Sequence, residues 1–369
     1  MIYIKINLEK WINEIITNKC YKSNIIKYNR LFYIFIIFFI LFFYLSFLYK
    51  IIRNRNNKNN IFKNLNIKYL VKKGKTLDNK TCKFIRNISK YRTNPFDFEN
   101  ELIFFISLLS CKIPFSFIRF GDGEEYIMRG EKIGSKADKW FWDPKNQNFR
   151  KNLIKSSSIC TKKNNFISIP CKNWIESSKS ILSFSKCTTA KYMSFATLFI
   201  NKNYPFFQDF ILHFIKNSNR WKIILVANSV INKNISWAYK YFPVPDHIVE
   251  NWDKIKISFL RKLSVEAKKN NLIFFVSAGP AANIIISTLT KLNNQNIYID
   301  LGSSIEFLTK GYSTRPYSNS NSQYAHQSCE PFLLKNKKLI YLDLEIFSTI
   351  FIILLNANSI LSSLSNSGT

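Results

Sequence analysis

Two carboxylates separated by a single glycine, Asp122 and Glu124, form the most suggestive chemical group in this 369-residue sequence. Glycine at position 123 permits backbone angles that would be strained for other residues, so both side chains can turn toward one point in a loop. Carboxylate oxygens suit a hard divalent cation such as Mg²⁺ or Mn²⁺, with water and substrate phosphates completing its coordination. The same tripeptide is also typical of a surface turn, because Asp-Gly is a common turn pair.

The residues around this pair favour a binding site over a turn. The stretch 115–120 alternates and is rich in β-prone residues, and it ends at Gly121, so it predicts a strand that delivers Asp122 to a loop. Arg119 is placed to act as a phosphate clamp. A second loop, 277–280 (Ser-Ala-Gly-Pro), opens a predicted helix whose N-terminus can receive a phosphate.

Strands and helices alternate around these loops. Further strands are predicted at 166–169, 222–227, 272–277 and 297–301, and helices at 95–111 and 281–292, the first of them capped by Asn94 before a proline. A strand, a Gly-Pro turn, a helix and another strand make a βαβ unit. We therefore expect a Rossmann-like α/β fold, a mostly parallel sheet flanked by helices, with ligands outside the carboxyl ends of the strands.

An apolar segment precedes this domain. Residues 31–49 carry no charge and are dominated by Phe, Ile and Leu, which predicts one transmembrane helix over 31–52. A cleaved signal peptide or a buried core helix is less consistent with its length and polar flanks. Basic residues flank both sides of the span, so they leave its orientation open. The predicted organisation is a tail at 1–30, this anchor, a linker at 53–94, a catalytic domain at 95–330 and a tail at 331–369.

The net charge of +31 raises the alternative of a nucleic-acid-binding or membrane-surface protein. Lys residues are spread along the whole length, however, and no zinc-finger, RRM or KH signature accompanies them, so nucleic acid is not the expected partner. Seven cysteines without a C-x-x-C pair indicate no zinc site and define no disulfide framework. N-x-[ST] sequons at 79, 87 and 234 would suit a lumenal domain, in the ER or Golgi if the source is eukaryotic.

Three further groups could contribute to a site. His247 lies beside a carboxylate in a proline-shaped loop, where it could act as a general base, although a lone histidine is more often structural. Arg315 could meet a donor phosphate, or it could be a solvated loop charge. The tryptophans could include a platform that stacks on a sugar, although most tryptophans serve the core; the candidates are Trp140, Trp142, Trp174, Trp221, Trp237 and Trp252.

The motifs together resemble a known family. The stretch 117–125, followed by Gly130, resembles the signature of the GT-D-type glycosyltransferases, first catalogued as a domain of unknown function. Residues 277–280 and 298–303 (Tyr-Ile-Asp-Leu-Gly-Ser) resemble two motifs of the family's second half, and the resemblance covers roughly 96–330. It implies a UDP-sugar donor, a divalent metal at Asp122 and Glu124, and a glycan or glycoprotein acceptor. The residues assigned to cofactor and donor binding are Gly121, Gly123, Ser277, Gly279, Asp300, Gly302 and Arg315.

These observations predict a membrane-anchored, metal-dependent glycosyltransferase that moves a sugar from a nucleotide diphosphate to an acceptor hydroxyl. Asp122 and Glu124 would hold the metal, and Arg119 would stabilise the leaving diphosphate. Two alternatives stay open, namely a non-catalytic nucleotide- or glycan-binding protein, and the basic nucleic-acid or membrane-surface protein.

Overall fold

The computed structural model describes residues 68–69, 77–136, 138–161, 163–171, 175–185, 187, 189–217, 221–228, 235–313 and 315–330. The predicted tail 1–30, the anchor 31–52, most of the linker 53–94 and the tail 331–369 lie outside these residues. In the described part of the chain, no helix is both long and apolar enough to cross a bilayer. Contacts divide the chain into Met1–Ile61 and Phe62–Thr369, and the fold described below belongs to the second unit.

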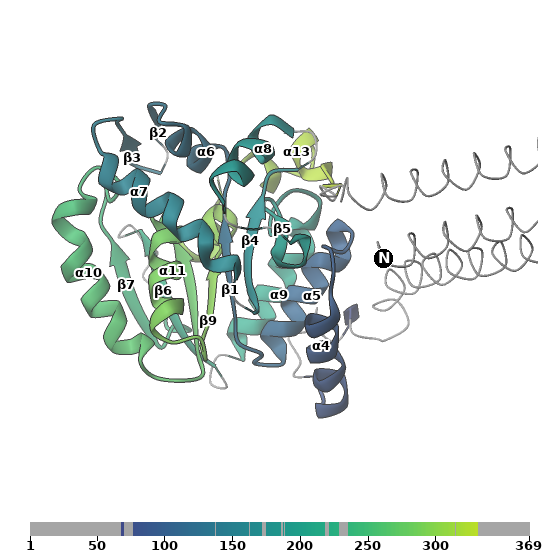
Figure 1. Ribbon diagram of the computed structural model, residues 1–369. Helices are drawn as coiled ribbons and strands as arrows, with labels where there is room; N and C mark the ends of the chain where they lie inside the picture. Colours follow the sequence, from purple (N-terminus) through teal and green to yellow (C-terminus); the bar gives the residue numbers. More distant parts are fainter. Residues whose placement is uncertain are drawn as a thin grey trace, which may run out of the picture. The chain divides into compact units, whose positions relative to one another are not determined.

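A parallel sheet of seven strands forms the centre of this unit (Figure 1). Its order is β5-β4-β1-β9-β8-β6-β7, and a separate hairpin pairs β2 with β3. The strands are β1 (Phe115–Arg119), β2 (Ile133–Ser135), β3 (Trp140–Trp142), β4 (Asn165–Ile169), β5 (Met193–Phe195), β6 (Lys222–Asn228), β7 (Lys240–Val244), β8 (Leu272–Ser277) and β9 (Ile297–Asp300). The expected α/β class and parallel sheet are confirmed.

Helices cover both faces of the sheet. The α-helices of the described residues are α4 (Asn79–Tyr91), α5 (Phe98–Ser110), α6 (Asp122–Arg129), α7 (Gln147–Ser156), α8 (Ile175–Phe184), α9 (Tyr204–Lys216), α10 (Trp252–Ala267), α11 (Ala281–Leu292), α12 (Glu306–Thr309) and α13 (Gln323–His326). Helices α7, α10 and α11 contact one another on one face, and α5 and α9 pack with their aromatic side chains on the other.

The central strands are buried on both faces, which is why they read as continuous apolar runs. In β1, Phe117 packs edge-on against Phe105 of α5 at a ring-centroid distance of 4.8 Å, whereas the adjacent Ile118 belongs to the core on the α7–α10–α11 side. The predicted strand at 115–120 and helix at 281–292 are thereby confirmed. Helix α5 begins at Phe98, three residues later than predicted, because the side chain of Asp97 caps it by accepting from Asn100 N at 3.0 Å.

The predicted linker extends too far toward the domain. Helix α4 lies within it, and a disulfide between Cys82 and Cys111 fixes α4 to the end of α5. Arg92 is buried and forms an ion pair with the buried Glu101 at 2.7 Å. The globular unit therefore includes Asn79–Arg92, because this segment buries an ion pair and carries a crosslink.

Three disulfides join the described cysteines, although the cysteine spacing predicted none. Besides Cys82–Cys111, they are Cys160–Cys187 and Cys171–Cys329, with Cα–Cα distances of 5.4, 5.7 and 5.2 Å respectively. These distances fall within the usual range for disulfides. The pairing links positions up to 158 residues apart, so only the fold brings the partners together.

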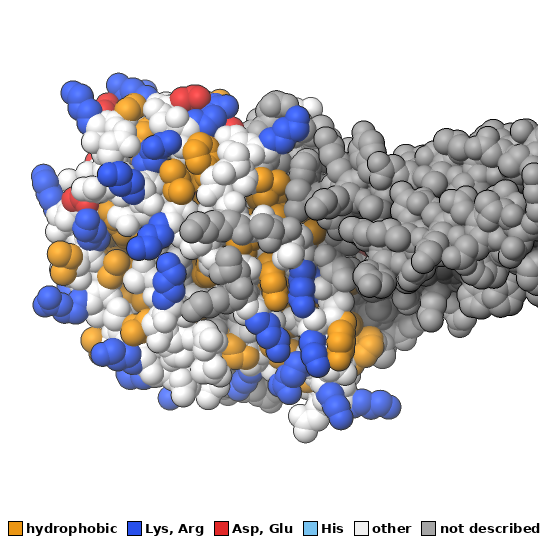
Figure 2. Space-filling model, in the orientation of Figure 1, with side chains coloured by type: hydrophobic (Ala, Val, Ile, Leu, Met, Phe, Trp, Pro, Cys, Tyr) orange, Lys and Arg blue, Asp and Glu red, His pale blue; other side chains and the backbone are white. Residues whose placement is uncertain are grey.

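Basic side chains are dispersed over the face shown in Figure 2. Lys and Arg residues there are separated by polar and apolar side chains and do not form one continuous stripe. A nucleic-acid-binding surface usually gathers its basic residues on one face or along one helix. The face in view shows no such gathering.

Candidate active site

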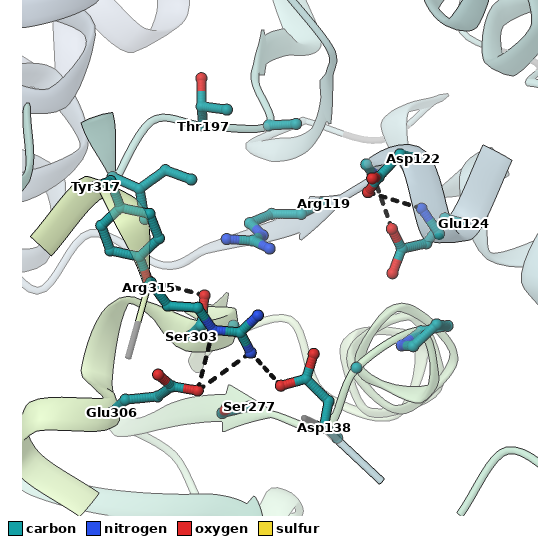
Figure 3. Close-up of a pocket in the computed structure, with 18 of the residues that line it drawn as sticks. Arg119, Asp122, Glu124, Asp138, Thr197, Ser277, Ser303, Glu306, Arg315 and Tyr317 are labelled. Atoms are coloured by element: carbon teal, nitrogen blue, oxygen red, sulfur yellow. Dashed lines mark hydrogen bonds and ion pairs between the residues drawn. The ribbon is translucent and has the colours of Figure 1, made fainter. Parts of the chain in front are cut away.

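A cavity of about 510 Å³ opens at the carboxyl ends of the parallel strands. Its walls come from the loops after β1, β4, β5, β6, β7, β8 and β9, together with the β2–β3 hairpin and the segment after α12. Most of the predicted site residues line it, and several of them are drawn in Figure 3. They are Arg119, Gly121, Asp122, Gly123, Glu124, Ser277, Gly279, Gly302 and Arg315.

Asp122 and Glu124 lie at the N-terminus of helix α6, not in a loop as predicted. Glu124 Oε2 accepts a hydrogen bond from Gly121 N at 2.9 Å, and Asp122 Oδ1 accepts one from Gly123 N at 2.9 Å. These bonds satisfy backbone donors at the start of the helix, and negative charge is favoured there. One oxygen of each carboxylate is therefore engaged in capping.

Arg119 links the ends of β1 and β9. Its Nε lies 3.6 Å from Asp300 Oδ2, and its Nε and Nη1 are buried without a hydrogen-bond partner. These two nitrogens are closed off from solvent, whereas the side chain as a whole is 21% exposed and lines the cavity. An anionic ligand in the cavity would meet the positive charge of Arg119 from its exposed side.

Glu124 is electrostatically coupled to Asp300. Burial and the charge of Asp300 raise the pKa of Glu124 to about 7. Burial also raises the pKa of Asp300 to about 6, against the opposing effect of Arg119. The carboxylate whose charge raises the pKa of Glu124 is thus Asp300, which lies 176 positions further along the chain.

Gly302 allows Arg119 to lie against the backbone after β9. A Cβ built on this glycine would lie 2.6 Å from Arg119 Nη2, and its φ of +49° is one that other residues rarely adopt. Asn283 of α11 completes this arrangement, because its side-chain amide donates to Arg119 O at 2.6 Å and accepts from Arg119 N at 3.2 Å. The position of Arg119 is therefore fixed from two sides.

Trp140 of the hairpin explains two other glycines of the motifs. A Cβ on Gly123 would come within 3.1 Å of its indole ring, and a Cβ on Gly279 within 3.1 Å as well. The indole therefore lies over the starts of both α6 and α11. Among the candidate platform tryptophans that the structure describes, Trp140 lines the cavity and the others do not.

Arg315 is already engaged by acidic side chains. It forms ion pairs with Asp138 and, at 3.2 Å, with Glu306, and these two carboxylates raise its pKa. Glu306 also accepts from Lys310 at 3.0 Å. This cluster forms one wall of the cavity and is drawn below Arg119 in Figure 3. A phosphate at this wall would compete with two carboxylates for Arg315.

His247 does not line the cavity. Its ring Nδ1 lies 2.9 Å from Glu250 Oε1, and its side chain is 60% exposed. The neighbouring Asp246 forms an ion pair with Lys139 at 2.9 Å. The geometry therefore gives His247 no contact with the residues gathered around Arg119.

The residues at the start of α6 fit a divalent cation only with help from a ligand. In the described part of the chain, no three His, Cys, Asp or Glu side chains form a metal-binding group. Asp122 and Glu124 can offer one oxygen each beyond those that cap the helix. Diphosphate oxygens and water would have to complete the coordination, as they commonly do for Mg²⁺.

Several residues of this site carry no motif signal. Asn283 and Asp138 act through contacts with Arg119 and Arg315, which lie far away in sequence, and Glu306 acts through its ion pair with Arg315. The wall formed by residues 324–328 depends on a disulfide that the cysteine spacing did not indicate. Only the polar character of Asn283 within an apolar helix could have marked it.

No family model and no curated protein matches the sequence. Three solved structures are similar. One is described as the domain of unknown function 1792 in selenomethionine form (16% identity, TM-score 0.42, covering 69% of this chain and 96% of that chain). A second is described as a highly conserved domain of unknown function 1792 with a distinct glycosyltransferase fold (18%, TM-score 0.41, 66% and 91%).

The third is described as a new glycosyltransferase from Streptococcus sanguinis, with 16% identity and a TM-score of 0.42, covering 63% of this chain and 91% of that chain. At these TM-scores, no residue role is carried over from those proteins. The structural neighbours of this chain are thus proteins of the domain of unknown function 1792, described as a distinct glycosyltransferase fold, the kind of protein that the sequence motifs resemble.

Proposed function

We propose that this protein is a glycosyltransferase that transfers a sugar from a nucleotide diphosphate, a UDP-sugar in the first instance, to an acceptor hydroxyl. The observation that carries the proposal is Arg119, a half-buried cation in the wall of the cavity whose side chain remains 21% exposed. A diphosphate offers negative charge and acceptor oxygens that match a guanidinium.

The surroundings of Arg119 support a diphosphate over a single carboxylate ligand. Helix α11 begins at the cavity, and helix N-termini favour phosphate groups, whereas the start of α6 is already capped by Asp122 and Glu124. Positive charge close to a departing diphosphate would stabilise the transition state of glycosyl transfer. In this proposal Arg119 binds the leaving group.

Asp122 and Glu124 are the residues that would hold a divalent cation such as Mn²⁺ or Mg²⁺. When bound, the cation would offset negative charge on the diphosphate. The charge of Asp300 disfavours ionisation of Glu124, and a cation beside Glu124 would offset this effect. Trp140, with part of its ring at the cavity wall, is positioned to stack on a flat group of the donor.

We place the catalytic domain outside the reducing cytosol, in the ER or Golgi lumen if the source is eukaryotic, held to the membrane by residues 31–52. Three disulfides within one domain support this location, because such bonds persist in oxidising compartments. The acceptor in such a compartment would be a glycan or a glycoprotein.

Donor consumption by the purified full chain tests the proposal. A panel of UDP-, GDP- and CMP-sugars is incubated with Mn²⁺ or Mg²⁺, and release of the nucleotide is measured with and without EDTA. We expect release from a UDP-sugar that depends on metal. No release from any donor would refute the enzymatic proposal, and binding of UDP without release would favour the non-catalytic nucleotide-binding alternative.

A further inference from the structure

The charged residues of the cavity wall come from one part of it. They follow β1, belong to the hairpin region or belong to α12 and the segment after it; they are Arg119, Asp122, Glu124, Asp138, Lys139, Glu306, Lys310 and Arg315. Among the described residues, which do not include 172–174, the wall at the carboxyl ends of β4 and β5 has none. It is formed by residues of the segments 170–171, 196–201 and 323–329. We call this wall the uncharged lobe, and we call its third segment, 323–329, the strap.

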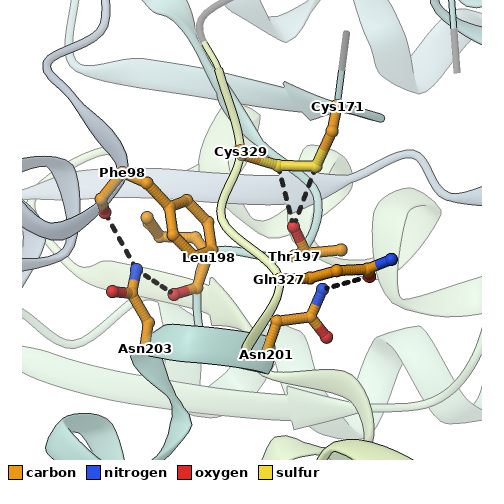
Figure 4. The surroundings of a disulfide bond; sticks show 8 residues. All are labelled: Phe98, Cys171, Thr197, Leu198, Asn201, Asn203, Gln327 and Cys329. Atoms are coloured by element: carbon orange, nitrogen blue, oxygen red, sulfur yellow. Dashed lines mark hydrogen bonds between the residues drawn. A yellow bond between two sulfur atoms is a disulfide. The ribbon is translucent and has the colours of Figure 1, made fainter. Parts of the chain in front are cut away.

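The strap is fastened to the lobe by covalent and polar contacts (Figure 4). Cys329 forms a disulfide with Cys171, and Thr197 Oγ1 lies 3.1 Å from the sulfur of Cys329. Asn201 Nδ2 donates to Gln327 Oε1 at 3.3 Å, and Lys202 N donates to Gln327 O at 3.1 Å. These contacts hold the strap as a fixed wall, which is what a binding site requires.

The base of the lobe is also fixed. The side-chain amide of Asn203, which is buried, donates to Phe98 O at 2.8 Å and to Leu198 O at 3.0 Å. Asn201 has a left-handed backbone, with φ of +57°, a conformation that asparagine adopts more readily than most residues. The short helix Asn201–Asn203 therefore presents Asn201 to the strap from a rigid support.

The side chains of the lobe suit a neutral sugar ring. Tyr324 lines the cavity and is 44% exposed, so part of its ring is available to a ligand. Amide and hydroxyl groups of Gln327, Asn201 and Thr197 can both donate and accept, as sugar hydroxyls do. Among the residues that the structure describes, no cation lines this part of the wall to pair with a phosphate or carboxylate on the ligand.

The opposite end of the cavity has a different character. After β6, β7 and β8 its lining is mostly apolar, with Ala227, Val244, Ile248 and Ala278. Flat and weakly polar groups such as a nucleobase fit apolar walls, whereas a hydroxyl-covered sugar requires polar partners. The charged centre around Arg119 lies between these two ends in the strand order of the sheet.

We propose that the uncharged lobe is the acceptor site, that it binds a neutral hexopyranoside, and that Tyr324 is the aromatic platform for its ring. This inference rests on the proposed glycosyl transfer. The acceptor hydroxyl oxygen forms a bond to the anomeric carbon of the donor sugar as the bond from that carbon to the diphosphate breaks. The nucleoside diphosphate leaves with the electron pair, and the hydroxyl proton is released to water.

Kinetics of Tyr324→Ala in the full chain test the inference, with the methyl β-glycosides of glucose, galactose and N-acetylglucosamine as acceptors. Tyr312→Ala is the matched control, because Tyr312 is 62% exposed and does not line the cavity. Loss of one aromatic stacking contact should raise the KM for the glycoside about tenfold. The effect should fall mainly on this KM and much less on the KM for the donor, and Tyr312→Ala should change neither.

A wild-type enzyme that consumes donor, with equal glycoside KM values in the two tyrosine variants, would overturn the inference and leave the proposed function standing. If the wild type consumes no donor, the proposed function fails, and saturation-transfer NMR decides the inference separately. Binding of a methyl glucoside that Tyr324→Ala weakens supports the site. The lobe is not a sugar site if no glycoside binds, if both variants bind equally, or if methyl glucuronide binds more tightly than methyl glucoside.

Discussion

The charged centre around Arg119 and the uncharged lobe beneath the strap are built in different ways. The centre depends on two short segments, 119–124 and 300–302, whose residues lie next to each other in the sequence and at the ends of adjacent strands. The lobe draws on three segments separated by up to 158 residues and joined by a disulfide. The centre is thus marked by two short motifs, although only the pairing of β1 with β9 brings them together, whereas no motif marks the lobe.

Arg119→Ala should produce the largest effect if the centre is responsible for catalysis. Removal of a group that stabilises charge in a transition state typically lowers kcat about 100- to 1,000-fold. Initial-rate measurements with a UDP-sugar would give the value, and circular dichroism would check that the fold is kept. Asn148→Ala, a change at an exposed hydrogen bond outside the cavity, is the control. A loss of less than tenfold for Arg119→Ala would remove Arg119 from the mechanism.

Loss of the Cys171–Cys329 disulfide should affect the lobe more than the centre. Cys329→Ser removes a crosslink between positions 158 residues apart. For a loop of that length the chain-entropy model predicts a stability loss of about 5 kcal/mol, with smaller values common in practice. The KM for the glycoside should rise while UDP still binds. Calorimetric unfolding measures the stability, initial rates measure the glycoside KM, and titration measures UDP binding. Cys82→Ser, at a disulfide away from the cavity, is the matched control. A selective loss of UDP binding would contradict the division of roles.

Gly302→Ala should disturb the centre without changing any charge. The added methyl group would meet the Arg119 guanidinium, and the positive φ disfavours alanine, so we expect a stability loss of about 1–3 kcal/mol. UDP affinity should fall together with stability. Denaturant unfolding and calorimetric titration give both quantities. Gly130→Ala, which also has a positive φ but nearest the side chain of Arg150, controls for backbone strain alone.

The smallest effect should be a pH-dependent change in stability. The pKa of Glu124 is raised from 4.5 to about 7 in the folded state, so the native protein binds more protons than the unfolded chain between these pH values. Stability is therefore lost as the pH rises through this window. Glu124→Gln keeps an acceptor for Gly121 N, so with EDTA present it should melt above the wild type near pH 8 and close to it near pH 4.5. An equal difference at both values would contradict the pKa shift.

Regular patterns in the sequence predicted the sheet and its position relative to the motifs. Alternation and apolar runs marked β1, β4, β6, β8 and β9, because strands buried on both faces leave a continuous apolar signal. The three-residue β5 was missed because it is too short for such a signal, and β7 because half-buried and exposed residues interrupt it. The linker 53–94 was misassigned at its end, because the burial of Arg92 depends on its partner Glu101.

The site was predicted only as far as its local parts. Arg119, Asp122, Glu124 and Gly279 line one cavity as expected, but the coupling between Glu124 and Asp300 follows from strand order. Nothing near Trp140 in the sequence shows that it covers Gly123 and Gly279. Contacts of this kind arise when separate strands end at one edge of the sheet, which no spacing along the chain records.

Calorimetric titration of UDP into the full chain with Mn²⁺ tests the central claim most directly, with wild type and Arg119→Lys compared. A guanidinium can donate two parallel hydrogen bonds to phosphate, whereas lysine offers a point charge, so we expect wild-type binding that weakens at least tenfold in the variant and in EDTA. Failure of the wild type to bind UDP, or equal affinity of the two proteins, would contradict the account.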